Sequence, residues 1–169
     1  LGTSNILIGE TGWPSEGRAR EDAVPSRINQ AKYVRDFVKL ADERNWNYNI
    51  IEAFDQPWKR VSEGAVGGYW GLFDENRADK NVFAGNVSNF PNYLYLALIS
   101  LGLAFAFYTT IRKKRLSKTK LIAFTVVNTI FAILLTLQIE QYYVISRNYL
   151  EAIWAIVIVG LCLYMYNFV

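Results

Sequence analysis

The chain has 169 residues, of which 52% are hydrophobic and 20% are charged, with a formal net charge of +3. The basic excess is no nucleic-acid footprint, because six basic residues crowd into the short stretch 112–120. The sequence contains no histidine and one cysteine, Cys162, so it cannot supply a histidine-ligated metal, a histidine-based triad or an intrachain disulfide. We predict neither a metal nor a cofactor.

Charged and apolar residues are segregated along the chain. Residues 1–90 carry 11 of the 18 basic and 13 of the 15 acidic residues, a net charge of −2 that suits a solvated domain. Apolar residues dominate from Tyr93 onward. We therefore predict two domains, residues 1–90 and residues 91–169. Because the chain starts at Leu1 rather than methionine and stops within an apolar run, we expect it to be a segment of a longer protein.

The first 54 residues follow an alternating strand and helix pattern. Residues 5–9 form a short apolar run that ends at Glu10 and a turn-rich sequence, which predicts a buried strand running into a loop. Ser26 is a suitable N-cap for a helix over residues 27–44, where apolar residues recur every three or four positions. Residues 48–54 form a second apolar strand. This order is typical of a parallel α/β unit.

Residues 60–92 are rich in glycine, asparagine and aspartate around the aromatic sequence Tyr69-Trp70-Gly71-Leu72-Phe73. This composition predicts loops and short irregular structure rather than a regular element. We expect the segment to close the first domain and to end in a linker over residues 86–92.

Three later stretches are long and apolar enough to cross a membrane. Residues 93–111, 121–139 and 152–169 contain 19, 19 and 18 residues without a charge. At about 1.5 Å rise per residue, a helix of 19 residues spans roughly 28 Å, close to the hydrocarbon thickness of a bilayer. We predict three transmembrane helices and an integral membrane protein.

The loop between the first two predicted spans, residues 112–120, carries six positive charges and no negative one. The positive-inside rule predicts that this loop is cytoplasmic. The first 90 residues and the loop 140–151 then lie on the outer side of the membrane.

The sequence around Glu10 resembles a known catalytic motif. Ile8-Gly9-Glu10-Thr11-Gly12-Trp13-Pro14-Ser15 is similar to the nucleophile motif of glycoside hydrolase family 17, the β-1,3-glucanases. Further phrases resemble that family in the same order: Ala23-Val24-Pro25-Ser26, Glu52-Ala53-Phe54-Asp55-Gln56-Pro57-Trp58-Lys59, Glu63-Gly64 and Tyr69-Trp70-Gly71-Leu72-Phe73. The resemblance covers about residues 5–75. It implies the last two strands and one helix of a (β/α)₈ barrel of the TIM type.

The resemblance implies that Glu10 is the catalytic nucleophile of a retaining glycosidase. Such enzymes use two carboxylates about 5–5.5 Å apart, one attacking the anomeric carbon and one protonating the leaving oxygen. In family 17 the acid/base glutamate lies on the fourth strand, which would precede Leu1, so we expect this segment to be inactive alone. On the residues alone, Glu10 could instead cap a helix or pair with an arginine.

Other motif residues are candidates for binding the sugar. Trp13, Trp58 and Trp70 fall on strand-end loops, where an indole plane can pack on a pyranose ring; the alternative is that they fill the mouth of the barrel. Lys59 is the candidate cation beside Glu10, or else a solvated lysine. Glu63 resembles a family acid that positions sugar hydroxyls, and Glu52 could give a supporting hydrogen bond; both could equally be structural.

A covalent intermediate on Glu10 can be released by water or by another glucan, so hydrolysis and transglycosylation both stay open. The membrane spans resemble bacterial fusions of a family 17 domain to a membrane-embedded β-glucan synthase. This resemblance implies a bacterial plasma-membrane protein whose enzyme domain lies outside the cytoplasm. Its expected partners are β-1,3-glucan, the lipid bilayer, and a β-glucan synthase domain in the same chain or in a partner chain. The alternative is a non-catalytic glucan-binding or anchoring protein. A transport subunit is disfavoured, because no predicted span contains a charge.

Overall fold

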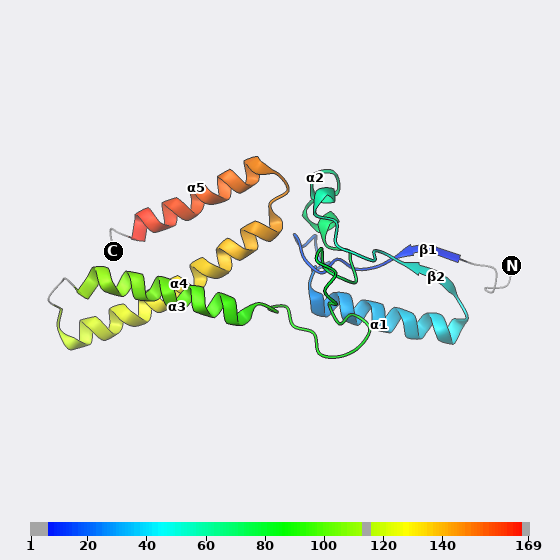
Figure 1. The fold of residues 1–169 in the computed structure, drawn as a ribbon, viewed down its shortest axis with the longest axis horizontal. Coiled ribbons are helices and arrows are strands. Elements are labelled where there is room, and N and C mark those ends of the chain that lie inside the picture. Colours follow the sequence, from blue (N-terminus) through cyan, green and yellow to red (C-terminus); the bar gives the residue numbers. More distant parts are fainter. Residues whose placement is uncertain (1–6, 113–115, 167–169) are drawn as a thin grey trace. The chain divides into compact units, whose positions relative to one another are not determined.

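The computed structural model describes residues 7–112 and 116–166 (Figure 1). The chain divides into two compact units. The first comprises Leu1–Asn89 with Val144–Glu151, and the second comprises Phe90–Tyr143 with Ala152–Val169. Each unit is described below by itself.

The first unit contains a parallel α/β unit, as the sequence predicted. Strand β1 (Leu7–Thr11) pairs in parallel with β2 (Asn47–Ile50), and helix α1 (Arg27–Arg44) connects them and lies alongside the pair (Figure 1). The helix has the predicted bounds. The register is irregular between Ile8 and Thr11.

Both strands differ from their predicted limits. Of the predicted strand 5–9, residues 5 and 6 lie outside the described residues, and β1 continues through Thr11, so Glu10 lies within the strand rather than after it. The second strand is shorter than the predicted stretch 48–54, because the backbone leaves β1 after the bond from Ile51 N to Thr11 O.

The backbone of residues 52–55, which follows β2, forms hydrogen bonds with the segment around Trp70 instead of with β1. The Glu52 N–H donates to Trp70 O at 2.9 Å, the Leu72 N–H donates to Glu52 O at 2.8 Å, and the Asp55 N–H donates to Phe73 O at 3.0 Å. These bonds satisfy the backbone of the extended segment without a regular strand. The aromatic segment around Trp70 is thereby fixed against the end of β2.

Helix α1 begins and ends with local capping signals. The Asn29 N–H donates to the Ser26 side chain at 3.0 Å, which confirms the predicted N-cap. Asn45 ends the helix in the left-handed conformation, with φ at 53°. The helix buries Gln30, Ala31, Val34 and Ala41, which follow the three- and four-residue spacing of one face.

The segment after β2 consists of short pieces, as its composition predicted: η2 (Pro57–Lys59), α2 (Arg60–Glu63) and η3 (Ala65–Gly68). Residues 81–85 are held against α1 by the Arg35 guanidinium, which donates to the carbonyl oxygens of Asn81, Val82 and Gly85 at 2.8–2.9 Å. The Ile28 N–H donates to the Asn89 side chain at 3.1 Å.

The second unit contains most of three helices: α3 (Tyr93–Arg112), α4 (Lys118–Ile145) as far as Tyr143, and α5 (Tyr149–Tyr166) from Ala152 onward. Among the described residues, α4 and α5 are long and apolar enough to cross a membrane, and Tyr93–Thr109 of α3 is a shorter apolar stretch. Two of the three predicted spans therefore meet this criterion of length and composition. Residues 113–115 of the predicted cytoplasmic loop and residues 167–169 of the last predicted span lie outside the described residues.

The three helices of the second unit meet at an aromatic cluster. The rings of Phe107, Phe131 and Tyr166, one from each helix, lie 4.6–5.7 Å apart between centroids. Asn128 is buried beside them and accepts a hydrogen bond from the Tyr166 hydroxyl. A buried amide bonded across helices favours specific helix association in apolar surroundings.

Candidate active site

Strand β1 presents the Glu10 side chain at its exposed surface, one residue before the strand ends. Its negative charge is among the causes that raise the pKa of Lys59, after the hydrogen bond and charge of Glu52 and the charge of Glu63. The charge of Glu10 therefore acts on the lysine of the loop after β2, the cation that the sequence analysis named as its candidate neighbour.

Lys59 is the centre of a cluster of carboxylates. Its ammonium forms an ion pair with Glu52 and lies 4.0 Å from Glu63 Oε1. Gln56 Nε2 donates to the second oxygen of Glu52 at 2.5 Å. The bonds to Glu52 hold the lysine in place, while the Glu63 side chain, 49% exposed, is accessible to a ligand.

Of the three tryptophans expected to bind sugar, Trp58 and Trp70 lie near the Lys59 cluster or the motif around Glu10. Trp58 is 68% exposed, and the Lys59 ammonium lies 5.7 Å from the centre of its ring. Trp70 packs beside the nucleophile motif, because a Cβ added at Gly12 would lie 3.4 Å from Trp70 Cε3. Both rings thus belong to the neighbourhood of Glu10 and the Lys59 cluster.

Trp13, the third of these tryptophans, packs against helix α1. Its indole N–H donates to Val24 O at 3.1 Å, and its ring lies 5.6 Å from that of Tyr33 on α1. It lines a cavity of about 420 Å³ formed mostly by α1 residues, and neither Glu10 nor Lys59 lines that cavity. The contacts of Trp13 given above are thus with Val24 and with α1.

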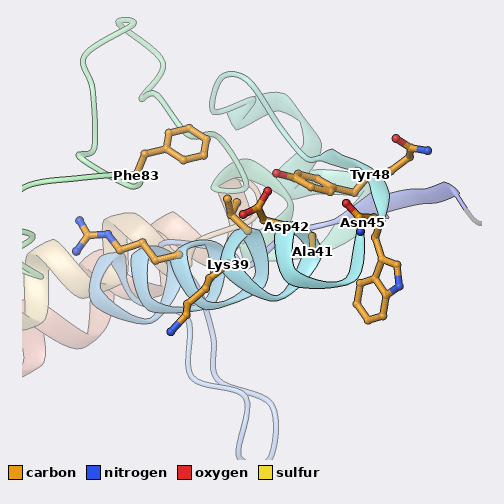
Figure 2. A pocket seen from close by; sticks show the side chains of 10 residues that line it. Lys39, Ala41, Asp42, Asn45, Tyr48 and Phe83 are labelled. Atoms are coloured by element: carbon orange, nitrogen blue, oxygen red, sulfur yellow. The ribbon is translucent and has the colours of Figure 1, made fainter. Parts of the chain in front are cut away.

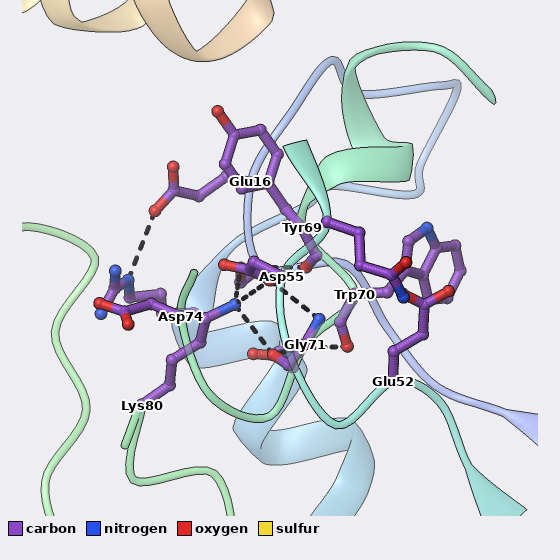
Figure 3. Close-up of polar contacts among 12 residues, drawn as sticks. Glu16, Glu52, Asp55, Tyr69, Trp70, Gly71, Asp74 and Lys80 are labelled. Carbon is purple, nitrogen blue, oxygen red and sulfur yellow. Dashed lines mark hydrogen bonds and ion pairs between the residues drawn. The ribbon is translucent and has the colours of Figure 1, made fainter. Parts of the chain in front are cut away.

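A buried ion pair lies beneath these loops, and the sequence reasoning missed it. Lys80 Nζ donates to Asp55 Oδ1 at 2.6 Å, to Ser15 Oγ at 2.9 Å and to Gly71 O at 2.9 Å (Figure 3). The side chains are 1% exposed for Lys80 and 8% for Asp55. Burial lowers the pKa of Lys80 and raises the pKa of Asp55, partly offset by their mutual attraction.

Two glycines permit this close packing. A Cβ at Gly71 would lie 2.1 Å from Asp55 N, and a Cβ at Gly12 would lie 2.4 Å from Ile51 O. Both distances are shorter than a non-bonded contact allows, so neither position accepts a side chain without a backbone shift. The nucleophile motif and the aromatic segment therefore pack directly on the backbone that follows β2.

A cavity at the C-terminal end of α1 is not part of this site. It has a volume of about 580 Å³, with Asp42, Asn45, Tyr48 and Phe83 in its lining (Figure 2). None of the site residues predicted from the sequence lines it. This cavity therefore does not mark the proposed site.

Comparisons with known proteins relate the first unit to glycosidases. Residues 1–71 match the family described as the BtgE/BtgC glycoside hydrolase domain. The glucan 1,3-beta-glucosidase of Saccharomyces cerevisiae is 37% identical over 70 residues, covering 39% of this chain and 22% of that protein. A glucan 1,3-beta-glucosidase of Candida albicans is 36% identical over 78 residues, covering 43% of this chain and 24% of that protein.

Among solved structures, the glycoside hydrolase family 17 beta-1,3-glucanosyltransferase of Rhizomucor miehei is 32% identical, with a TM-score of 0.42 over 47% of this chain and 30% of that one. The chain spans less than a quarter of the length of the two curated relatives above. Both curated relatives are fungal, so they give no support to the expected bacterial source. Over its first 71 residues this chain is therefore similar to a glycoside hydrolase domain and to glucan 1,3-beta-glucosidases.

Proposed function

We propose that the protein to which this chain belongs is a retaining β-1,3-glucan glycosidase or glucanosyltransferase, with Glu10 as its nucleophile. The observation that carries the proposal is the position of Glu10, exposed near the end of a parallel strand and within the electrostatic reach of Lys59. Active sites of parallel barrels gather at the C-terminal ends of the strands. The curated relatives are named as glucan 1,3-beta-glucosidases, which supports the substrate class.

The proposed reaction has two steps. A Glu10 oxygen bonds to the anomeric carbon while the glycosidic bond breaks, and a second carboxylic acid gives its proton to the leaving oxygen. That second residue then takes a proton from water or from a sugar hydroxyl, whose oxygen displaces Glu10. In this proposal β1 and β2 are the last two strands of a (β/α)₈ barrel, and the acid/base residue belongs to its fourth strand, upstream of Leu1.

The residues around Glu10 take supporting roles in the proposal. Lys59 supplies a positive charge near Glu10, and Glu52 orients that lysine through their ion pair. Glu63 accepts hydrogen bonds from sugar hydroxyls, while the rings of Trp58 and Trp70 pack on the sugar faces. We assign Trp13 to packing on α1, because its N–H and ring are engaged there.

The test is a time course of laminaripentaose with the full-length protein, followed by proton NMR and by mass spectrometry. We expect the β-anomer to appear first in the newly formed ends, since two displacements at one carbon retain its configuration. Shorter products alone indicate hydrolysis, and products longer than the substrate indicate transfer. Initial release of the α-anomer contradicts the retaining mechanism, and tight binding without turnover favours the non-catalytic alternative.

We also propose that the chain is anchored in a membrane with its enzyme domain outside the cytoplasm. The length and apolar composition of α4 and α5 and the six basic residues of 112–120 support this arrangement. The resemblance to membrane-embedded synthase fusions supports a β-glucan synthase domain, in the same or a partner chain, as the source of the glucan.

Reporter fusions test the topology. A reporter joined after Lys120 is expected to be active on the cytoplasmic side, and one joined after Asn86 on the outer side, because positively charged loops are retained in the cytoplasm. A pair of reporters, alkaline phosphatase and a fluorescent protein that folds only in the cytoplasm, measures both sides. The reverse pattern would refute the outer location of the glucan site.

A further inference from the structure

We propose that Lys80 is a positioning residue of the glucan site, which fixes three loops that carry the reacting and binding residues. This role rests on the proposed function. Lys80 lies in the segment that follows the family match at residues 1–71, so the match assigns it nothing. Its side chain is nevertheless the most deeply buried charged group of the first unit, at 1% exposed among the described residues.

The three acceptors of Lys80 come from three separate segments. Ser15 ends the nucleophile motif that begins with Glu10, Asp55 lies on the loop after β2, and Gly71 belongs to the aromatic segment (Figure 3). An ammonium group has three N–H donors and no acceptor. Each donor therefore has one acceptor, and each acceptor has a different origin in the chain.

Each tied segment carries a residue of the proposed site. Ser15 is buried and also bonds to Tyr69 O through its N–H, at 2.8 Å, which joins the nucleophile motif to the aromatic segment. Gly71 follows Trp70, and its N–H donates to Asp55 Oδ1 at 2.9 Å. Asp55 precedes the loop that carries Lys59. Removing the Lys80 ammonium therefore breaks three hydrogen bonds that together join these three segments.

Burying the charged side chain of Lys80 at this position is energetically unfavourable. Removing an ammonium and a carboxylate from water is unfavourable, and apolar residues of similar volume often stabilise a protein as well as a buried ion pair does. What apolar groups cannot supply is a fixed direction and distance to three oxygen atoms. The geometry around Lys80 therefore suits the alignment of loops better than it suits stability alone.

Two variants of the full-length protein separate alignment from stability. Asp55→Asn combined with Lys80→Met removes both charges, so neither is left buried without a partner, and the amide oxygen introduced at position 55 can still accept from the Gly71 N–H. Ser15→Ala removes one acceptor and keeps the ion pair. Lys39→Met, at an exposed lysine of α1, is the matched control.

Below their melting temperatures, we expect the double variant to lose about 10- to 100-fold in kcat on laminaripentaose and Ser15→Ala to lose less, with KM changing less than kcat. Misplaced reacting groups lower kcat in a folded enzyme, whereas a merely structural role lowers the melting temperature and leaves kcat intact. Hydrogen exchange is expected to quicken at the amides of Ser15, Glu52 and Gly71, while those of α1 stay protected. Lys39→Met should change none of these.

The outcomes separate this proposal from the proposed function. Normal kcat in both folded variants, with an active wild type, overturns the role of Lys80 and leaves the glycosidase proposal standing. If the double variant does not fold, Ser15→Ala decides by the same criterion. A wild type without turnover refutes the glycosidase proposal and with it a catalytic positioning role, whatever hydrogen exchange shows about the loops.

Discussion

Replacing Glu10 with glutamine in the full-length protein is expected to lower the turnover of linear β-1,3-glucan by at least about 10³-fold and to leave oligosaccharide binding intact. Glutamine keeps the shape of the side chain but cannot form the ester bond to the anomeric carbon. The loss should therefore fall on kcat, because the interaction that is removed exists only in the reacting complex. Rates on laminaripentaose and its binding isotherm measure the two effects separately.

Melting temperature distinguishes this result from a structural role for Glu10. If Glu10 were an ion-pair partner, the substitution would cost about 1 kcal/mol of stability or less and leave the rate per folded molecule nearly unchanged. Glu43→Gln, at an exposed position on α1, is a control that should change neither quantity. A folded Glu10→Gln protein with more than about half the wild-type rate removes Glu10 from the mechanism.

Chemical rescue gives an independent check of the nucleophile. In Glu10→Ala, added azide or formate can occupy the space left by the carboxylate and attack the same carbon. One displacement in place of two inverts the configuration, so the product should carry the α linkage. An α-glycosyl azide formed in the presence of azide supports the nucleophile role directly, whereas a β-glycosyl azide contradicts it.

The isolated fragment 1–90 is expected to show no cooperative unfolding. The described sheet has two strands, each with an open edge, and two strands with one helix make up about a quarter of an eight-stranded barrel. Exposed apolar residues such as Leu7, Phe54 and Val61 would have no cover in this fragment. Thermal melts by circular dichroism and sedimentation measure folding and aggregation.

The full-length protein is the reference for that experiment, and a domain with complete upstream sequence but without residues 91–169 is its control. We expect the control to unfold in one sharp transition, because a closed barrel buries its own core. A sharp transition from the 1–90 fragment alone would show that the barrel assignment is wrong. The proposed upstream acid/base residue would then lose its structural basis as well.

Local signals account for what could be predicted from the sequence. Helix α1 has its predicted bounds because Ser26 caps it and its apolar residues share one face. The parallel pairing followed from the order of strand, helix and strand. Lys59 was expected near Glu10 because their motifs follow neighbouring strands, and strand ends of a parallel sheet meet at one edge; their contact stays a prediction.

Long-range contacts account for what could not be predicted. The second strand ends early because the backbone of Glu52 and Asp55 is hydrogen-bonded to the aromatic segment around Trp70. No local sequence pattern predicts this pairing. No local pattern indicated that Tyr33 on the following helix would provide a packing surface for Trp13. Lys80 is 65 residues from Ser15 in the chain, and nothing in a glycine- and asparagine-rich segment marks one lysine as buried.

The absence of side chains at Gly12 and Gly71 limits where the specificity of this site can be redesigned. Any substitution at either position forces its backbone away from residues 51–55 and disturbs all three loops at once. Trp58, by contrast, is exposed, and the half-exposed Glu63 lies on the same short stretch. A library meant to change acceptor preference should randomise positions 58 and 61–63 and hold both glycines constant.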